Sequence, residues 1–235
     1  MKAVLTGHSK GLGAALARDL LGRGIAVLGL ARSASGLSHP LLTEVTIDLG
    51  DTGALARWLA GDAMDSYLQG AGCALLLNNA GTVQPVGSLA DQDPAAVAAS
   101  VGVNVAAPMM LAAALARIPV AEKRILHVSS GAGSSAYPGW SVYCATKAAL
   151  DHHARAVALD AVKGMRICSL APGVVDTGMQ AEIRATPASR FPKRERFVEL
   201  KRSGQLSSPA DCAFGVVNYL LADRFGERPV DDLRQ

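Results

Sequence analysis

The segment Thr6-Gly7-His8-Ser9-Lys10-Gly11-Leu12-Gly13 decides the fold of this 235-residue chain. It follows an apolar run, residues 2–6, and opens a stretch with helical periodicity, residues 11–23. Glycines between a strand and a helix permit a tight turn, and the helix N-terminus offers unpaired N–H groups with a partial positive charge. Three glycines alone can be a structural turn, but in this context they predict a dinucleotide site. We expect the residues that line it to be Gly7, Ser9, Lys10, Gly11, Leu12 and Gly13, and we assign no catalytic role to His8.

Short aliphatic runs alternate with helical segments along almost the whole chain. Near-continuous apolar runs are typical of strands buried on both faces of a parallel sheet. The expected strands are residues 2–6, 25–30, 44–48, 73–78, 124–128 and 166–170, and the expected helices are residues 11–23, 52–68, 94–117, 141–162 and 209–222. Asp51, Asp93 and Ser208 stand where helix N-caps are expected. This order predicts a single α/β domain over residues 1–235, with a doubly wound parallel sheet of the Rossmann type.

Two connections between these elements have unusual lengths. Only twelve residues, 31–42, join the second and third expected strands, so any helix there is rudimentary. Residues 173–205 are long for a strand-to-helix connection, and long loops in compact domains are usually functional. Since ligands bind beyond the carboxyl ends of parallel strands, we expect residues of about 174–206 to form a short helical lid over a substrate.

The composition excludes several classes of protein. Half of the residues are hydrophobic by type, which excludes a disordered chain, and a net charge of +3 is too small to indicate a nucleic-acid partner. The uncharged run 94–116 is long enough for a membrane, yet it is rich in Ala and holds two prolines, which favours a helix buried in protein. The four cysteines lie 71, 24 and 44 residues apart, which matches no zinc or redox spacing. We therefore expect no metal, no membrane and four separate buried thiols in the reducing cytoplasm, with no signal peptide after Met1-Lys2.

The end of the second expected strand indicates which dinucleotide binds. An NAD site places an acid there to hold the ribose 2′-hydroxyl. Here the strand ends Leu28-Gly29-Leu30-Ala31-Arg32-Ser33, with an arginine and no acid, and Lys10 adds a second cation. Because Arg and Lys suit a 2′-phosphate, Lys10, Arg32 and Ser33 predict NADP. The alternative is that Arg32 is a solvated loop cation.

Tyr143 and Lys147 stand four residues apart in the expected helix 141–162 and so share one face. A nearby ammonium stabilises tyrosinate and is expected to lower the phenol pKa from about 10 towards neutrality. Tyr143 is then a candidate general acid for a carbonyl oxygen. Taken alone, such a pair is also common on protein surfaces.

Together with its other motifs, the chain resembles the short-chain dehydrogenase/reductase family over essentially its whole length. The shared motifs are Thr6-Gly7-x-x-x-Gly11-x-Gly13, Asp48-Leu49, Asn78-Asn79-Ala80-Gly81, Val103-Asn104-Val105, Ser130 thirteen residues before Tyr143, and Pro172-Gly173 with Thr177. The resemblance implies that Tyr143 protonates a carbonyl polarised by Ser130. It also implies that Lys147 tunes Tyr143 and holds the nicotinamide ribose, while Asn104 keeps a relay water. The cofactor contacts implied in addition are Asp48, Leu49, Asn79, Ala80, Gly81, Tyr143, Lys147, Pro172, Gly173, Val175 and Thr177.

After Pro172 the likeness narrows to the branch of sepiapterin reductases and bacterial benzil reductases. It rests on Asp176-Thr177-Gly178-Met179-Gln180 and on Glu199-Leu200-Lys201 with Gly204 and Leu206. This branch reduces one carbonyl of a vicinal diketone with NADPH. It implies that Asp231 anchors the substrate, the alternative being a polar residue that ends the last strand.

Aromatic residues mark the expected substrate side. Tyr137 and Trp140 precede Tyr143 closely, and their faces suit a flat or aryl-bearing substrate. Packing in the core is the alternative for these two residues. In the lid, Met179, Phe191 and Phe197 are expected to close over the substrate.

Three functions stay open. The first is an NADPH-dependent carbonyl reductase that acts on a vicinal diketone. The second keeps the chemistry but uses another ketone/alcohol pair, such as a 3-oxoacyl thioester or a hydroxysteroid. The third is a non-catalytic NADP-binding regulator, against which the presence of Ser130, Tyr143 and Lys147 speaks. The family resemblance also implies a homodimer or homotetramer, formed through helix 94–116 and the helix that carries Tyr143.

Overall fold

Seven parallel strands form the central sheet of the protein, whose computed structural model describes residues 1–234. The strands are β1 (Lys2–Thr6), β2 (Ala26–Ala31), β3 (Leu42–Thr46), β4 (Cys73–Asn78), β5 (Glu122–Val128), β6 (Met165–Ala171) and β7 (Val230–Asp232). Their order in the sheet is β3-β2-β1-β4-β5-β6-β7. The direction of winding thus reverses between β1 and β4, which confirms the doubly wound parallel sheet.

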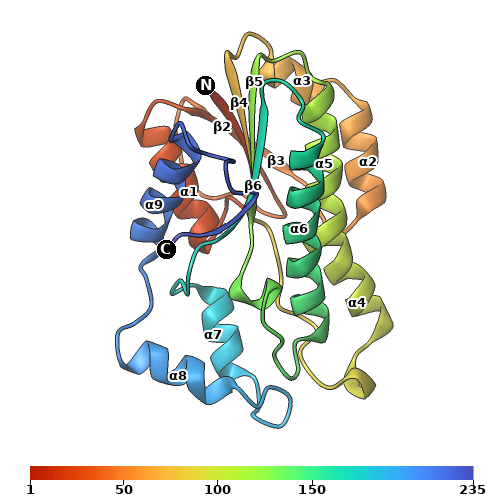
Figure 1. Cartoon of the computed structure of the whole chain (residues 1–235), viewed down its shortest axis with the longest axis vertical. Coiled ribbons are helices and arrows are strands. Elements are labelled where there is room, and N and C mark those ends of the chain that lie inside the picture. Colours follow the sequence, from red (N-terminus) through yellow and green to blue (C-terminus); the bar gives the residue numbers. More distant parts are fainter. Residues whose placement is uncertain (235) are drawn as a thin grey trace.

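Helices cover both faces of this sheet (Figure 1). On one face lie α1 (Gly11–Gly22) and α9 (Pro209–Leu221). On the other face lie α2 (Thr52–Ala60), α3 (Ala63–Leu68), α4 (Pro94–Val101), α5 (Ala107–Arg117) and α6 (Ser141–Leu159). Alternate strand residues supply two separate cores: Leu5 and Leu77 pack on the α1 side, whereas Val4 and Leu76 pack on the opposite side. The sheet is therefore buried on both faces, as its aliphatic strands require.

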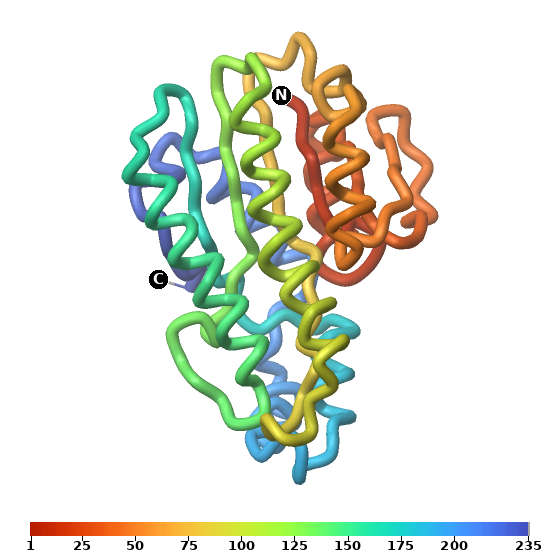
Figure 2. The backbone as a smooth tube through the Cα atoms, turned by 90° about the vertical axis from the view of Figure 1, so that its right-hand side faces the viewer, coloured from red at the N-terminus to blue at the C-terminus, as the bar shows by residue number. Residues whose placement is uncertain are grey.

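The helices α4 and α5 are joined by a π-helical turn, η2 (Gly102–Ala106), into one run, Pro94–Arg117. Figure 2 shows this run as a long rod beside α6. Within residues 1–234 it is the one helix long and apolar enough to cross a membrane by length and composition, a test that core helices also pass. Leu111, Ala112 and Leu115 on this rod are buried in the core against the sheet.

Several boundaries differ from those expected. Residues 52–68 form two helices because α2 stops at Ala60, where Gly61 takes up extended backbone. The third strand pairs with β2 over Leu42–Thr46, so Asp48 lies beyond its end. The helix expected over residues 141–162 ends at Leu159, shortly before Ala161 with its φ of +49°. The three expected N-caps are confirmed, because Asp51, Asp93 and Ser208 each accept a hydrogen bond from the N–H three residues later.

The long connection after β6 contains two helices, α7 (Gly178–Ala185) and α8 (Arg194–Arg202). They lie beyond the carboxyl ends of the strands, below the sheet in Figure 1, and we call residues 174–206 the lid. A third apolar cluster, separate from the two cores of the sheet, joins the lid to the start of α6. The connection between β2 and β3, by contrast, contains no helix.

The four cysteines are unpaired. Cys73, Cys168 and Cys212 are buried, as expected. The expectation is wrong for Cys144, which is half-buried because it lies in the first turn of α6, where its Sγ approaches Ser135 O at 3.7 Å.

Candidate active site

The glycine loop between β1 and α1 has the shape of a phosphate cradle. Gly7 and Gly11 adopt φ values of +68° and +53°, which side chains rarely tolerate. A Cβ on Gly13 would lie 2.0 Å from Gly7 O, so only glycine lets α1 start this close to the loop. Lys10 is the N-cap residue of α1, and its side chain caps no N–H of the first turn. The residues present therefore fit the pyrophosphate of a dinucleotide.

The loop lies against the turn that follows β4. Asn79 Nδ2 donates to Thr6 O at 3.0 Å and to Gly7 O at 3.3 Å. Thr6 Oγ1 in turn accepts from the N–H groups of Asn79 and Ala80, both at 2.9 Å. The structure thus places Asn79-Ala80 directly beside the loop, as the expected cofactor site requires.

The start of the lid reaches the same cradle. A Cβ on Gly11 would lie 3.4 Å from the side chain of Thr177. Pro172 and Val175, earlier in this segment, are buried, and Gly173 has a φ of +86°. The connection after β6 is therefore brought to the glycine loop at Thr177.

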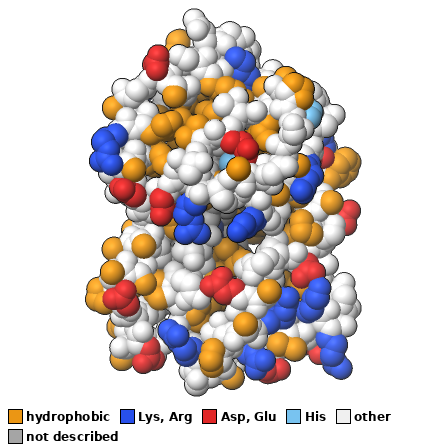
Figure 3. All heavy atoms as spheres, turned by 180° about the vertical axis from the view of Figure 1, so that it is seen from behind, with side chains coloured by type: hydrophobic (Ala, Val, Ile, Leu, Met, Phe, Trp, Pro, Cys, Tyr) orange, Lys and Arg blue, Asp and Glu red, His pale blue; other side chains and the backbone are white. Residues whose placement is uncertain are grey.

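The residues expected at the adenosine end lie after β2 and β3. Arg32 and Ser33 are exposed, and the hydroxyl of Ser33 lies 3.5 Å from that of Ser9 in the glycine loop. Asp48 is also exposed and accepts from Gly50 N at 2.9 Å, whereas Leu49 is buried. Seen from behind, the molecule narrows between its sheet and its lid, and Lys and Arg side chains gather at this waist (Figure 3).

His8 ties the glycine loop to β3. Its ring is 1% exposed, and Nε2 lies 2.6 Å from Glu44 Oε1. Glu44 also accepts from Ser35 N at 2.7 Å, so its carboxylate is occupied by protein groups. A Cβ on Gly29 would lie 2.4 Å from the His8 ring. A glycine in the middle of β2 is thus explained by the histidine that packs on it.

Tyr143 and Lys147 lie on the buried face of α6, with 7% and 5% of their surface exposed. Lys147 Nζ donates to Val128 O at 2.8 Å and stands 5.7 Å from the centre of the Tyr143 ring. Ser130 follows β5 and caps the short helix η3 (Gly131–Gly133) by accepting from Ala132 N. The structure thus brings Ser130, Tyr143 and Lys147 into one site.

Burial sets the protonation of this group. It raises the pKa of Tyr143 to about 12, and the hydrogen bond with Ser130 acts in the opposite direction. Burial also lowers the pKa of Lys147 to about 8, against the influence of the Asp151 charge. The expectation that Lys147 brings the pKa of Tyr143 towards neutrality is therefore wrong for the protein without ligands, since loss of hydration disfavours tyrosinate more strongly. Tyr143 carries its proton at neutral pH and is able to donate it.

Asn104 lies in the π turn η2, 1% exposed, and its side chain clamps the chain after β4. Its Oδ1 accepts from Thr82 N and its Nδ2 donates to Thr82 O, both at 2.9 Å. Nδ2 also donates to Thr146 Oγ1 on α6 at 3.2 Å. A Cβ on Gly81 would lie 3.2 Å from Asn104 Oδ1 and 3.8 Å from Lys147 Nζ. Asn104 and Gly81 are therefore neighbours of Lys147, and a π turn often marks such a functional position.

The aromatic residues expected on the substrate side form a cluster with Tyr143. Trp140 stacks on Phe191 with ring centres 4.4 Å apart, and it lies 5.3 Å from the rings of Tyr137 and Tyr143. Core packing describes the buried Trp140, Phe191 and Phe197, whereas Tyr137 and Met179 are half-buried against them. Two buried polar atoms in this region have no hydrogen-bond partner among the described residues, Trp140 Nε1 and Gln180 Oε1.

Asp231 is not brought to this site. It lies opposite Leu170 in β7, and its Oδ2 accepts from Tyr219 on α9 at 2.9 Å. Asp231 therefore fits the alternative interpretation, a polar residue of the last strand.

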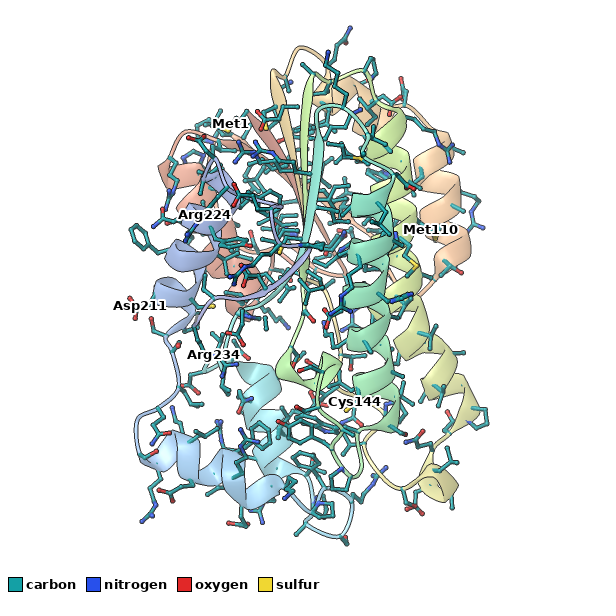
Figure 4. The ribbon with its side chains drawn as sticks, viewed as in Figure 1. Met1, Met110, Cys144, Asp211, Arg224 and Arg234 are labelled. Carbon is teal, nitrogen blue, oxygen red and sulfur yellow. The ribbon has the colours of Figure 1, made fainter. Side chains whose placement is uncertain are left out.

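The next residue along, Asp232, pairs with Arg234, whose side chain lies 3.4 Å from the position of a Gly173 Cβ. Figure 4 places Arg234 between the end of β6 and α7. Sequence reasoning thus missed Arg234, a basic residue next to the start of the lid.

A buried acid was missed as well. Tyr143, Lys147 and Asp151 follow one another at intervals of four residues, and the structure buries all three. This spacing on one helical face is the signal that could have found Asp151.

Comparisons with known proteins agree with this geometry. Residues 1–188 match the family model described as short chain dehydrogenase. The chain is 32% identical to benzil reductase ((S)-benzoin forming) of Bacillus cereus, over 97% of this chain and 96% of that protein. It is 34% identical to sepiapterin reductase of Meriones unguiculatus, over 94% of this chain and 92% of that protein. A crystal structure of a short-chain dehydrogenase/reductase from Burkholderia vietnamiensis superposes with a TM-score of 0.70 at 49% identity, covering 100% of this chain and 97% of that one. The chain therefore belongs to the short-chain dehydrogenase family, whose members are oxidoreductases that interconvert CH–OH and C=O groups with a nicotinamide cofactor.

Proposed function

We propose that this protein is an NADPH-dependent carbonyl reductase that reduces one carbonyl of a vicinal diketone. The observation that carries the proposal is the buried Tyr143, one helical turn before Lys147 and within an aromatic cluster, with a pKa on which Ser130 acts. A protonated phenol beside a serine hydroxyl is arranged to donate to a carbonyl oxygen.

The chain's own residues then perform the proton side of the reaction. When bound, the nicotinamide supplies the hydride that adds to the carbonyl carbon. Ser130 and Tyr143 hold the carbonyl oxygen by hydrogen bonds, and the Tyr143 hydroxyl gives its proton to that oxygen. Protonated Lys147 stabilises the tyrosinate that remains, because an ammonium at this range favours the charged phenol. Asn104, next to Lys147 across Gly81, holds the turn after β4 in place behind it.

Arg32 supports the choice of NADP. It is exposed at the carboxyl end of β2, where a 2′-phosphate is recognised in this fold. Glu44, the acid of the neighbouring strand, is occupied by His8 and Ser35. Because Glu44 is engaged by these two groups, Arg32 is left to meet the cofactor, and its guanidinium suits a phosphate better than a bare hydroxyl.

The aromatic cluster and the relatives support the substrate class. Tyr137 and Met179, half-buried against the core residue Trp140, offer an apolar wall beside Tyr143, which suits a flat, aryl-bearing ketone. The two named relatives have benzil and sepiapterin as substrates in their names, and both are matched along more than nine-tenths of their length.

The decisive experiment is oxidation of NADPH with a panel of benzil, other 1,2-diketones, sepiapterin and a 3-oxoacyl ester. The diketones are expected to be reduced fastest, whereas a clear preference for the ester would reject the substrate class. Tyr143→Phe is expected to abolish turnover while NADPH still binds. Tyr219→Phe is the matched control, because this tyrosine lies on α9 and contacts Asp231. Substantial activity of Tyr143→Phe would remove Tyr143 from its role.

The cofactor is tested separately by fluorescence titration. NADPH is expected to bind more tightly than NADH, and Arg32→Ala is expected to remove most of the difference. Arg117→Ala, which changes an exposed arginine at the end of α5, is the control and leaves the difference intact. Equal affinities of the unaltered protein for both cofactors would contradict the assignment of Arg32.

We propose further that the protein assembles as a homodimer or homotetramer through α4, α5 and α6. An apolar surface groove between α4 and α6 supports this, with Val97, Val101, Val105 and Val142 among its lining residues. Light scattering after gel filtration measures the assembly, and Val101→Glu is expected to shift it to the monomer. A monomer in the unaltered protein would contradict the proposal.

A further inference from the structure

Asp151 is a buried carboxylate to which the mechanism above gives no part. It lies on α6 one turn after Lys147 and is 6% exposed. Its Oδ1 accepts two hydrogen bonds, from Ser129 Oγ at 2.6 Å and from Ser169 Oγ at 2.7 Å. A buried acid is costly unless it is hydrogen-bonded, and these two serines meet that need.

The two serines belong to neighbouring strands at the edge where the site is built. Ser129 directly follows β5 and precedes Ser130, and its own N–H donates to Leu170 O on β6. Ser169 lies on β6 itself. The Asp151 carboxylate therefore ties α6 to the ends of both strands, immediately behind Ser130.

The loop after Ser130 is shaped around this carboxylate. A Cβ on Gly133 would lie 2.4 Å from Asp151 Oδ2 and 3.2 Å from the backbone carbon of Lys147. No residue other than glycine allows η3 to pack this closely on α6. The position of the capping serine Ser130 thus depends on a contact with Asp151.

Asp151 is also the charge that acts on Lys147. Its negative charge opposes the effect of burial on the pKa of Lys147. On the same helix Tyr143 is neutral at neutral pH, and burial lowers the pKa of the half-buried His153. The sequences of α4, η2 and η3 contain no titratable side chain.

The charged residues of β5 and β6 lie at the starts of these strands, whereas Lys147 contacts Val128 at the end of β5. They are Glu122, Lys123, Arg124 and Arg166, and Glu122 pairs with both arginines. On β5, burial holds the pKa of His127 at about 3, so this ring is neutral. On β6, burial raises the pKa of Cys168 to about 11, and its side chain lies in the core on the opposite face. On β7, Asp231 accepts from Tyr219 and Asp232 pairs with Arg234.

We propose that Asp151 is a positioning residue of the active site: it fixes Ser130 through the strand ends, and its charge keeps Lys147 protonated at neutral pH. The inference rests on the proposed function, because it assumes that Lys147 must be cationic while Tyr143 gives up its proton. Asp151 acts through Ser130 and Lys147, because Ser129, Ser169 and Gly133 enclose its carboxylate.

Asp151→Asn separates the two roles. The amide oxygen is able to accept from both serines, and the amide nitrogen takes the place of Oδ2 against Gly133, so the geometry is kept and the charge is lost. Without the charge, Lys147 deprotonates at lower pH, and the alkaline fall of kcat is expected about one pH unit lower than in the unaltered protein. Ser169→Ala is the matched control, because it removes one hydrogen bond and leaves the charge. In Ser169→Ala, the alkaline fall of kcat is expected at the same pH as in the unaltered protein.

A second readout does not depend on turnover. Fluorescence titration of NADPH at increasing pH reports the charge of Lys147, which is expected to contact the nicotinamide ribose. The pH at which binding weakens is expected to fall by the same amount in Asp151→Asn. If Asp151→Asn fails to fold, Asp151→Ser is used in its place, because a smaller neutral residue leaves room for water at the two serines and gives the same expected shift.

The outcomes separate this inference from the proposed function. Superimposable pH profiles for Asp151→Asn and the unaltered protein overturn the role of the charge, and an equal shift in Ser169→Ala overturns it as well. If no diketone is reduced, the proposed substrate is wrong, but the shift in NADPH binding is still measured. A shift confined to Asp151→Asn and Asp151→Ser supports the inference.

Discussion

Gly29→Ala is the substitution with the most sharply defined consequence, because β2 packs on the ring of His8 at this position. The added methyl would lie 2.4 to 2.6 Å from three ring atoms, closer than any van der Waals contact, and β2 lies inside the sheet between β1 and β3. The ring has to move, and its 2.6 Å contact with Glu44 is then lost.

The two effects can be added roughly. Overpacking of a core by one methyl costs about 1–3 kcal/mol, and loss of the hydrogen bond costs about 1 kcal/mol. We therefore expect Gly29→Ala to lower the free energy of unfolding by about 3 kcal/mol, which for a domain of this length lowers Tm by roughly 6–12 °C. Because the glycine loop then loses its tie to β3 through Glu44, the affinity for the nicotinamide cofactor is expected to fall about fivefold.

Urea denaturation measures the loss of stability in Gly29→Ala, and a double-mutant cycle with His8→Ala tests its cause. Gly22→Ala is the matched control, since a Cβ there meets nothing within 4 Å, and it is expected to change stability by no more than about 1 kcal/mol. His8→Ala removes the ring, so adding Gly29→Ala to it is expected to cost almost nothing further. If Gly29→Ala lowers the free energy of unfolding as much in the His8→Ala variant as in the unaltered protein, the glycine does not serve to accommodate the His8 ring. That result would refute the reasoning.

Three further predictions concern the buried polar groups. Initial rates of ketone reduction are expected to fall as the pH rises through about 8, where Lys147 loses its proton, and a rate that stays level to about pH 10 would contradict this. Burial lowers the folded-state pKa of His127 to about 3, so its neutral form stabilises the fold above its unfolded pKa of about 6.5, and stability falls with pH below that by up to about 1.4 kcal/mol per unit. His127→Gln is expected to flatten this slope in urea titrations, and an unchanged slope would assign the loss to other groups. Asn104→Ala leaves both backbone groups of Thr82 without their partner and is expected to cost about 2–3 kcal/mol in thermal unfolding, against less than about 1 kcal/mol for Ser100→Ala, whose hydroxyl meets Asn104 at 3.4 Å; equal costs would speak against the clamp.

The parts of the fold that follow local patterns were predictable. Aliphatic strands, helical periodicity and the caps at Asp51, Asp93 and Ser208 each depend on neighbouring residues, so the order of elements and the α/β class follow from them. The boundaries of β3 do not, because its residues pair with β2 alone and its pattern is weakly apolar.

The sequence motifs predicted which residues belong to the site, but they predicted less well which of these residues contact one another. Side chains alternate along a strand, so a shift of one residue exchanges the two faces of the sheet. In β7 this decides that Asp231 meets α9, whereas Asp232 pairs with the arginine beside Gly173. The predicted lowering of the Tyr143 pKa was wrong because the spacing of residues along a helix shows that Lys147 is near but not how deeply both side chains are buried.

The π turn between α4 and α5 has a consequence for the whole rod Pro94–Arg117. Each residue of an α-helix turns the chain by about 100°, so one extra residue in a wide turn rotates everything after it relative to everything before. The half before η2 presents Val97 and Val101 to the groove beside α6, while the half after it buries Leu111 and Leu115 against the sheet. Deleting one residue within 102–106 would bring the two halves into a common phase, and only one of these two faces could then keep its contacts.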